Sequence, residues 1–320
     1  MKERLSRAVR GQWRQGNRFN ASHLDDMPCS VVELDGCRPI TEDDVPDADV
    51  ILSSWWETTE WMQSYSDTKG VKVSFLQHHE VHSWLPVERV QNVWRLPIPK
   101  IVVSRWLQDI ARDEYGDHGA ILVPNGLDTD HFRFVDRGLS GKRVVGAMSG
   151  SMGHASFKRF WLAVETVKVL QARGHEIEFV GFGNRVEDGE LPAHSKFEVA
   201  PEQARIAEIY ASCDCWLFTS DKEGYGLPLL ESMACGTPVV ATPAGAAPEL
   251  LESGGGVLVD SDEPNVLADA VERVLGLPDA EWRAMSKAAR DEAERHSWSV
   301  IGDRMESALL EILSSANTSV

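Results

Sequence analysis

Two glutamates stand out in the stretch Trp216–Thr242, which reads WLFTSDKEGYGLPLLESMACGTPVVAT. Glu223 falls in a polar, glycine-containing loop, and Glu231 falls about one turn into the helix predicted after it. The helix dipole alone favours a carboxylate near a helix start, so Glu231 could be merely structural. An anionic pair beside an apolar loop is nevertheless costly unless it meets hydroxyls or cations. The pair therefore suits a polyhydroxylated ligand, whose phosphate would suit the backbone N–H groups of Gly226 and Leu227.

The elements that must position these glutamates form a strand–loop–helix–strand unit. The apolar run Cys215–Thr219 predicts a buried strand. Pro228 stands at a position that helix starts tolerate, and Gly236 is typical of a helix end. A second buried strand, Pro238–Ala241, follows at once. Such units build parallel sheets covered by helices, which bind ligands at the carboxyl ends of their strands.

The rest of the chain continues this alternation of strands and helices. Its 320 residues favour two domains, with a plausible linker at 136–142. Before the linker, we expect residues 104–116 to form a helix capped by Ser104. We also expect a turn at Asn125–Gly126. After it, we expect a helix over 157–173 and nearly continuous helix over 280–315, with a break near 296–298. The expected strands are Cys29–Leu34, Val50–Ser53, Val71–Leu76, Ile101–Val103, Ala120–Val123, Arg143–Met148, Glu176–Val180, Phe197–Val199 and Val257–Val259.

Composition narrows the classes of function. The net charge of −18 argues against a general nucleic-acid binder. No apolar run approaches the roughly 20 residues that span a bilayer, and the opening lacks the apolar core of a signal peptide, so the expected compartment is the cytoplasm. The opening is locally basic at helical spacing. This basic segment is either a helix face exposed to solvent or a surface that contacts phosphate, acidic partners or the inner face of the membrane. Its basic residues are Lys2, Arg4, Arg7, Arg10, Arg14 and Arg18.

A metal site is not expected. The five cysteines lack metal-like pairing and favour buried, reduced thiols. Asp-x-Asp triplets hold metals in some enzymes, but chance matches are expected in a chain this rich in aspartate. They occur at Asp47–Asp49, Asp128–Asp130 and Asp260–Asp262.

The glutamate pair in its setting, strand–EGYG–helix–GTPVVAT, closely resembles the signature of the retaining, nucleotide-sugar-dependent glycosyltransferases of family four. Other segments resemble this family in the right order: IVVSRWLQDIARDEYG, ILVPNGLDTDHF, VATPAGAAPELLESGGGVLVD and HSWSVIGDRMESAL. The resemblance covers roughly residues 75–315. It implies the α/β GT-B fold, in which two Rossmann-like parallel-sheet domains face a cleft. We expect an acceptor domain over 1–138, a donor domain over 139–298, and a last helix over 299–320 that returns to the first domain.

The resemblance implies roles for residues of the donor domain. Glu231 would bind the ribose hydroxyls of the nucleotide, and Glu223 would contact the donor sugar. Lys158 would grip the diphosphate and stabilise the charge of the departing nucleotide. No metal or other cofactor is implied. Loop amides at Tyr225, Gly226 and Leu227 would contact sugar and phosphate, and the nucleotide site would extend to Gly183 and Val199.

In the acceptor domain, the segment QHHEVHSW stands where the family has a His-Asp or similar pair at a strand end near the donor sugar. His79 is the better match to the catalytic position, His78 is its neighbour, and Glu80 replaces the usual Asp. Aromatic faces stack on sugar rings, so Trp55 and Trp56 are candidates for the acceptor side, although tryptophan more often packs in a core.

The sequence departs from the family pattern in two places. Between Gly146 and Phe157 it lacks the Arg that usually precedes the diphosphate lysine, and Arg159 could substitute. The usual opening strand and glycine-rich loop are also missing, so the first domain is expected to be reduced. The expected activity is transfer of a sugar to a hydroxyl of a polysaccharide, glycolipid or small molecule. The alternatives are a non-catalytic relic that binds nucleotide or glycan or scaffolds a partner, and a phosphorylase or epimerase. Base, sugar, acceptor and oligomeric state are not set by the sequence.

Overall fold

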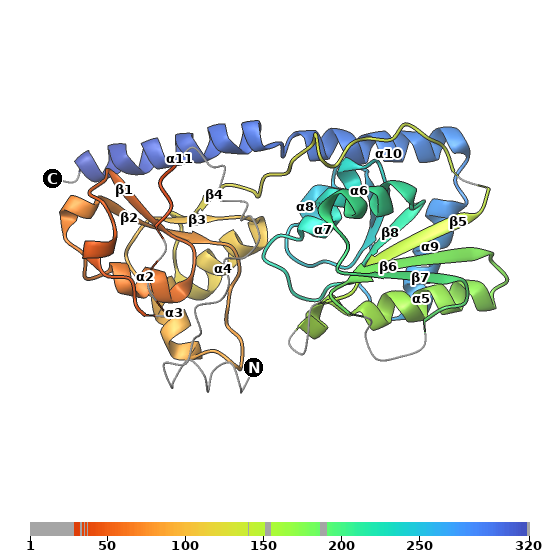
Figure 1. The fold of residues 1–320 in the computed structure, drawn as a ribbon, viewed down its shortest axis with the longest axis horizontal. Coiled ribbons are helices and arrows are strands. Elements are labelled where there is room, and N and C mark those ends of the chain that lie inside the picture. The colour runs from red at the N-terminus through yellow and green to blue at the C-terminus, as the bar shows by residue number, and fades with distance from the viewer. Residues whose placement is uncertain are drawn as a thin grey trace.

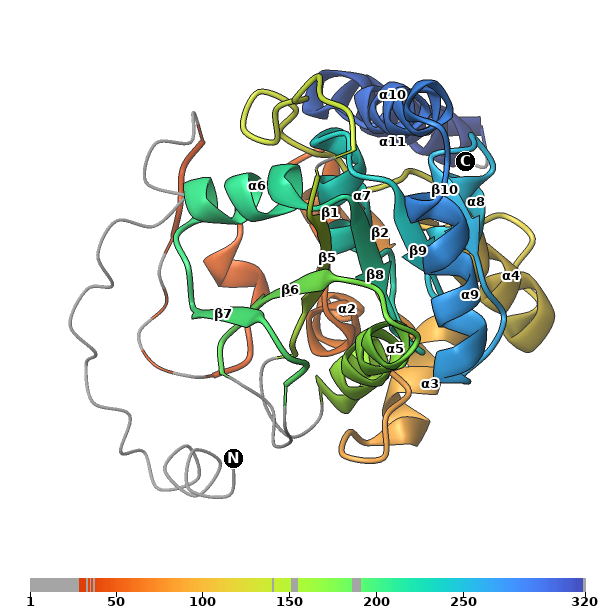
Figure 2. The same ribbon diagram turned by 90° about the vertical axis from the view of Figure 1, so that its right-hand side faces the viewer.

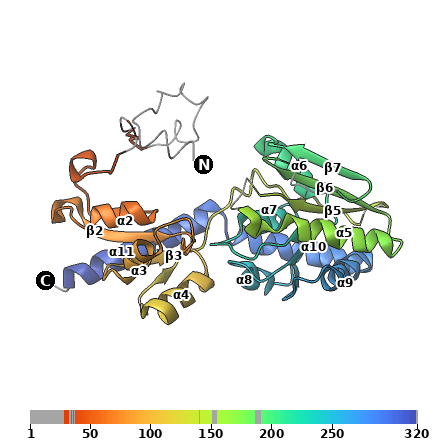
Figure 3. The same ribbon diagram turned by 90° about the horizontal axis from the view of Figure 1, so that it is seen from below.

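A computed structural model describes residues 29–318 except 33, 35, 37, 140, 151–154 and 186–190. Two separate parallel sheets lie side by side along the long axis of the molecule (Figure 1; Figure 3). This is the expected α/β architecture of two Rossmann-like domains. The exact boundary at 138–139 stays a prediction. The basic opening, with Lys2 to Arg18, lies outside the described residues.

The first sheet has the order β1-β2-β3-β4, with all strands parallel. Helix α11 covers one face of it, where Val73 and Ile101 share a buried cluster with Ile312 (Figure 1). Helices α3 and α4 contribute to the buried cluster on the other face. The elements are η1 Glu42–Asp44, β1 Val50–Ser53, α2 Trp56–Met62, η2 Asp67–Lys69, β2 Val71–Leu76, α3 Val87–Arg95, β3 Lys100–Val102, α4 Arg105–Tyr115, β4 Ile121–Leu122 and α11 Trp298–Thr318.

The second sheet has the order β10-β9-β8-β5-β6-β7, also parallel. From β5 the chain builds outward through β6 and β7, then returns to place β8 on the other side of β5. The crevice at the ends of β5 and β8 is therefore the switch point where such sheets bind ligands. The elements are β5 Arg143–Met148, η3 Ala155–Lys158, α5 Phe160–Ala172, β6 Ile177–Gly183, β7 Ser195–Val199, α6 Gln203–Ser212, β8 Cys215–Phe218, α7 Leu227–Ala234, β9 Val239–Ala241, α8 Ala247–Leu251, β10 Gly256–Leu258, α9 Pro264–Leu275 and α10 Asp279–Glu294.

Helices cover both faces of the second sheet (Figure 2). Helices α5 and α9 pack together in one buried cluster, and α6 and α7 contribute to another. Cys215 lies in the first of these clusters and Cys213 in the second, so the two thiols lie on different sides of the sheet. Burial raises the pKa of Cys213 to about 12, which leaves this thiol protonated and unreactive.

Most of the predicted elements are confirmed. The bounds of β1, β2 and β5 are as expected, and the Ser104 side chain caps α4 by accepting a hydrogen bond from the Leu107 N–H at 3.3 Å. The predicted strand at Cys29–Leu34 is wrong, since none of its described residues is in a strand. Val31 and Val32 are 50% and 67% exposed, so this short apolar run has no sheet to join.

Three short helices, α2, α3 and α8, were not predicted. The segments of α2 and α8 span seven and five residues, which is too short to show a helical period. In the described part of the chain, no helix is long and apolar enough to cross a membrane.

Replacing Ile312 by Ala should lower the free energy of unfolding by about 2–5 kcal/mol, because it removes a buried side chain that joins α11 to the first sheet. The control is Leu310→Ala on the same helix, where the side chain is 56% exposed and the change should stay within about 0.5 kcal/mol. Urea unfolding measures both. Equal losses in the two variants would contradict the packing of α11.

Candidate active site

Glu223 and Lys158 meet at the switch point of the second sheet. Lys158 ends the segment that follows β5, and Glu223 lies in the loop that follows β8. Lys158 Nζ lies 2.5 Å from Glu223 Oε1, and Ser220 Oγ lies 2.8 Å from the same oxygen. Both charged side chains are largely buried, with 15% and 11% exposure. These two opposite charges therefore pair with each other at the switch point.

Glu231 lies within α7, where its Oε2 accepts a hydrogen bond from Tyr210 Oη at 2.8 Å. Burial raises the pKa of Glu231, against the lowering effects of the Tyr210 hydrogen bond and the Lys158 charge. Lys158 therefore acts electrostatically on Glu231 as well as on Glu223. Of the two glutamates singled out from the sequence, Glu223 pairs directly with Lys158, and Glu231 is hydrogen-bonded to Tyr210 within electrostatic range of the same lysine.

Helix α7 opens on this crevice with its amino terminus. Its N-cap, Gly226, has φ of +106°, and a Cβ there would lie 2.9 Å from the Phe218 ring, so glycine is required on both counts. The first turn of a helix leaves backbone N–H groups without partners inside the helix. The N–H groups of Gly226 and Leu227, with the positive end of the helix dipole, therefore suit an anion.

Arg159 follows Lys158, but its side chain binds the loop after β8 and Asp262. Its Nε and Nη2 donate to the backbone carbonyls of Thr219 and Ser220, at 2.8 and 3.3 Å, and its Nη1 pairs with Asp262. These hydrogen bonds hold the loop after β8 in place. Lys158 remains the cation of the crevice.

Gly183 and Val199 are partners in register at the carboxyl ends of β6 and β7. A Cβ at Gly183 would lie 2.8 Å from the Ser149 carbonyl oxygen, so the glycine permits close approach of the loop after β5. Val199 is 58% exposed. Both residues lie along the same rim of the sheet as the switch point, on the side away from β8.

His78 and His79 point to different surroundings. His79 Nε2 lies 2.8 Å from Tyr115 Oη, and its ring makes edge contacts with Trp94 and Trp106, so it is held by aromatic side chains of α3 and α4. His78 Nδ1 accepts a hydrogen bond from the Glu80 N–H at 3.1 Å, and a Cβ at Gly224 of the second domain would lie 3.2 Å from His78 Cα. Burial lowers the pKa of His78 to about 4, with smaller contributions from the charges of His82, His79, Lys222 and Lys158.

Glu80 turns back toward the start of α2. Its backbone has φ of +56°, and its carboxylate accepts a hydrogen bond from the Trp56 N–H. Burial raises the pKa of Glu80 to about 7. Trp56 itself is 4% exposed and belongs to the core, whereas Trp55 is 41% exposed beside it. Only Trp55 of this pair has a face available to a ligand.

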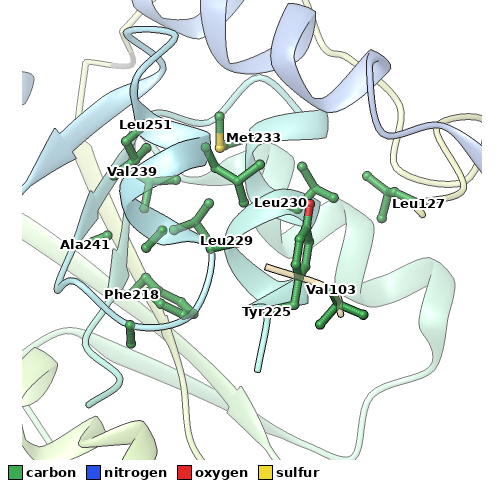
Figure 4. Packing of buried hydrophobic residues seen from close by; sticks show 14 of the residues in the cluster. Val103, Leu127, Phe218, Tyr225, Leu229, Leu230, Met233, Val239, Ala241 and Leu251 are labelled. Carbon is green, nitrogen blue, oxygen red and sulfur yellow. The ribbon is translucent and has the colours of Figure 1, made fainter. Parts of the chain in front are cut away.

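The first domain touches the donor-side loop directly at Gly224. A Cβ at this position would lie 1.6 Å from the carbonyl oxygen of Gln77, and the Gly224 carbonyl accepts a hydrogen bond from Ser104 Oγ at 2.7 Å. Neither contact was predicted from the sequence, which identified Ser104 only as a helix cap. The remaining loop residue, Tyr225, turns its ring away from the crevice to lie beside Val103 (Figure 4).

Within the described residues, no group of three or more His, Cys, Asp or Glu side chains could hold a metal ion. The triplet at Asp128 has a structural explanation, because Asp128 Oδ1 accepts the backbone N–H groups of Asp130 and His131 at 3.0 and 2.9 Å. His78 and His82 have ring centroids 5.0 Å apart, and His82 stacks on Trp84.

Comparison with known families identifies the domain that carries the crevice. Residues 143–276 match the model for glycosyl transferases group 1, a span from β5 to the end of α9 that includes Lys158, Glu223 and Glu231. This part of the chain, from β5 to α9, belongs to the group 1 glycosyltransferase family. The family is the one expected from the EGYG signature.

Curated relatives match only part of the length of this chain. D-inositol 3-phosphate glycosyltransferase of Thermobispora bispora is 33% identical over 126 residues, which is 39% of this chain and 29% of that protein. The same enzyme of Segniliparus rotundus is 36% identical over 105 residues, or 32% of this chain and 23% of that protein. These matches therefore span less than a third of the relatives.

Solved structures cover more of this chain and show that it has the GT-B fold. Sucrose-phosphate synthase of Thermosynechococcus elongatus has a TM-score of 0.67 at 18% identity, over 83% of this chain and 74% of that one. HepE of Anabaena in complex with UDP-glucose has a TM-score of 0.66 at 20% identity, over 83% and 79%. Both sheets and their arrangement are thus common to these proteins.

The imidazole of His78 should stay neutral down to about pH 4, because burial disfavours its charged form. An NMR titration of histidine side chains, with the signal assigned by its loss in His78→Gln, measures this. Since the folded pKa is depressed, the unfolded chain binds more protons between about pH 4 and the ordinary value near 6.5. His78 should therefore lower stability as the pH falls through that window. Titration near pH 6.5 would contradict its burial.

Proposed function

We propose that the protein transfers a sugar from a nucleoside-diphosphate sugar to an acceptor hydroxyl, with retention of the anomeric configuration. One observation carries the proposal: Lys158, Glu223 and Glu231 converge at the switch point, in front of the amino terminus of α7. This set combines a cation and free amides for a diphosphate with carboxylates for sugar and ribose hydroxyls. Catalysis of this type depends on charge that develops on the leaving group.

Each group has a distinct task in the proposed reaction. The bond between the sugar C1 and the diphosphate oxygen breaks, and a bond from C1 to the acceptor oxygen forms on the same face. Lys158 and the amides of Gly226 and Leu227 stabilise the charge on the departing nucleotide. A phosphate oxygen takes the proton of the acceptor hydroxyl. Glu223, released by Lys158, accepts hydrogen bonds from the donor sugar, and Glu231 accepts them from the ribose.

In the first domain, we infer that His78 rather than His79 faces the donor sugar. His78 lies within the electrostatic reach of Lys222 and Lys158, whereas His79 is held by Tyr115. A neutral imidazole can donate a hydrogen bond to a sugar hydroxyl or accept one from it. Glu80 and the exposed Trp55 lie behind it on the acceptor side, and Gly183 and Val199 border the proposed nucleotide site.

The acceptor is proposed only as a hydroxyl-bearing glycan, glycolipid or small molecule. HepE of Anabaena has been solved in complex with UDP-glucose and with UDP. Uridine nucleotides are therefore the first probes for the present protein, followed by those of guanine, thymine and adenine.

A non-catalytic nucleotide binder is the second candidate. It is favoured by the engagement of Arg159 with two carbonyls and Asp262, which leaves the proposed diphosphate site with one lysine where the family usually has an Arg and a Lys. Slow hydrolysis of a nucleotide-sugar separates the two candidates. Release of sugar supports the transferase, and nucleotide binding without turnover of any donor supports the binder.

Glu231→Ala should abolish nucleotide binding, because the ribose loses its carboxylate partner. A nucleoside diphosphate at 100 times its dissociation constant should stabilise the unaltered protein by about 2.7 kcal/mol, seen as a thermal shift with UDP, GDP, dTDP or ADP. Calorimetric titration with the nucleotide that binds then compares the variants. The control is Glu208→Ala on the exposed side of α6, which should bind normally. Unchanged affinity of Glu231→Ala would remove the ribose assignment.

Lys158→Met should reduce turnover of the donor by about 10²–10³-fold, since a preorganised charge at the leaving group is lost. Lys168→Met, on the same side of the domain in α5, serves as the control and should leave turnover unchanged. Hydrolysis of the nucleotide-sugar in the absence of acceptor measures both. A loss below about threefold in Lys158→Met would show that the leaving group is stabilised elsewhere.

A further inference from the structure

The loop of residues 223–226, called here the donor loop, is enclosed by parts of both domains. Gly224 lies against Gln77 so closely that no side chain fits, with 1.6 Å from a built Cβ to the carbonyl oxygen. Ser104 is fully buried, and its hydroxyl donates to the Gly224 carbonyl at 2.7 Å. A buried hydrogen bond across 120 residues of sequence thus ties the first domain to the middle of the donor loop.

A second tie reaches the same place from the other side. Glu249 of α8 accepts the backbone N–H of Arg105 at 3.2 Å, and its other oxygen lies 3.2 Å from Arg105 Nε. Its carboxylate therefore meets the positive amino terminus of α4, one residue after Ser104. The Glu249 side chain is only 14% exposed. Partial burial makes this pair less screened by solvent than an exposed one.

The segment before Glu249 in turn packs on the donor loop. The Ala246 N–H donates to the Tyr225 carbonyl at 2.8 Å. A Cβ at Gly245 would lie 2.6 Å from the Tyr225 carbonyl oxygen and 2.8 Å from Glu223 Cβ. Displacement of α8 from α4 would therefore be transmitted to Tyr225 and Glu223 through main-chain contacts.

We propose that Ser104 and Glu249 form an interdomain clamp that positions the donor loop for the reaction. The assignment of the loop to donor binding rests on the proposed function, whereas the clamp itself rests on the contacts observed between the two domains. Ser104 fixes the Gly224 carbonyl, and Glu249 fixes α8 against the amino terminus of α4. Both are positioning residues, because they act through the main chain that carries Glu223 and the amides of Gly226 and Leu227.

Ser104 offers a clean separation of its two roles, since its Oγ also caps α4 by accepting the Leu107 N–H. Glycine serves almost as well as serine as a helix cap, whereas alanine does not. Ser104→Gly therefore removes the hydroxyl bound to Gly224 and largely keeps the cap. Ser104→Ala removes both, and Ser104→Thr keeps the hydroxyl and the capping oxygen.

The test is hydrogen–deuterium exchange of the peptide that covers the donor loop, in the full chain without ligand. Ser104→Gly and Ser104→Ala should both raise the exchange rate of this peptide by about five- to tenfold, as expected for loss of one buried hydrogen bond. Ser104→Thr should restore the original rate. If exchange rises only in the peptide that covers α4, and only in the Ser104→Ala variant, then the Ser104 hydroxyl serves only as the helix cap. That result would overturn the clamp.

Glu249→Ala tests the second half of the clamp, with Glu252→Ala as its matched control, because Glu252 also pairs with Arg105 but is 63% exposed. Exchange in the donor loop should rise in Glu249→Ala and stay within about twofold in Glu252→Ala. Equal behaviour of the two variants would overturn the role of Glu249.

Kinetics then separates the clamp from the proposed function. In Ser104→Gly, kcat for donor hydrolysis should fall about tenfold, whereas affinity for the nucleoside without its phosphates should stay within about twofold, because Glu231, proposed to hold the ribose, lies outside the clamp. Equal losses in kcat and nucleoside affinity would contradict a positioning role. Absence of nucleotide binding in the unaltered protein would reject the proposed function, and the exchange experiment would still decide the clamp.

Discussion

The structure depends on the close contact between the donor loop and the first domain at Gly224. The backbone of Gln77 occupies the space that any side chain at position 224 would need. This contact places the end of β2 directly beside the loop after β8, although the two belong to different sheets. The proposed site therefore draws on both domains: glutamates, lysine and helix terminus from the second, and His78 from the first. Neither domain presents this combination by itself.

Charge balance in the crevice explains how such a site remains stable without its ligand. A buried lysine or glutamate without a partner is strongly destabilising, and the pairing of Lys158 with Glu223 removes that cost. In the proposed reaction, the diphosphate takes over Lys158 and the sugar hydroxyls take over Glu223. Each charge exchanges one partner for another, so the donor does not leave an unpaired charge behind. Arg159 keeps its carbonyl partners throughout and holds the loop after β8 in place.

Local patterns predicted the elements that build this site, because their signals lie in neighbouring residues. The Cys215 strand, the start of α7 at Pro228 and the Ser104 cap each follow from spacing or from one residue type. The glutamate signature then predicted the family and the fold. The strand predicted at Cys29–Leu34 failed for the opposite reason: its composition is suitable, but a strand needs a neighbouring strand, which composition does not reveal.

The orientation of the histidines and the contacts between domains lie beyond such patterns. After β2 the chain leaves the regular extended conformation, and Glu80 adopts a positive φ of 56°, so strand alternation no longer tells which way His78 and His79 point. The hydrogen bond from Ser104 to Gly224 joins residues 120 positions apart and leaves no trace in local sequence. The sequence assigned a role only to the backbone amide of Tyr225, and it did not reveal that the ring lies beside Val103 (Figure 4).

The most direct test of this account is a crystal structure of the protein with the nucleoside diphosphate that binds it. The account predicts that Lys158 Nζ leaves Glu223 for the diphosphate, that the diphosphate lies at the amides of Gly226 and Leu227, and that Glu231 accepts hydrogen bonds from the ribose. A nucleotide bound away from α7, or one bound with the Lys158–Glu223 pair intact, would contradict it.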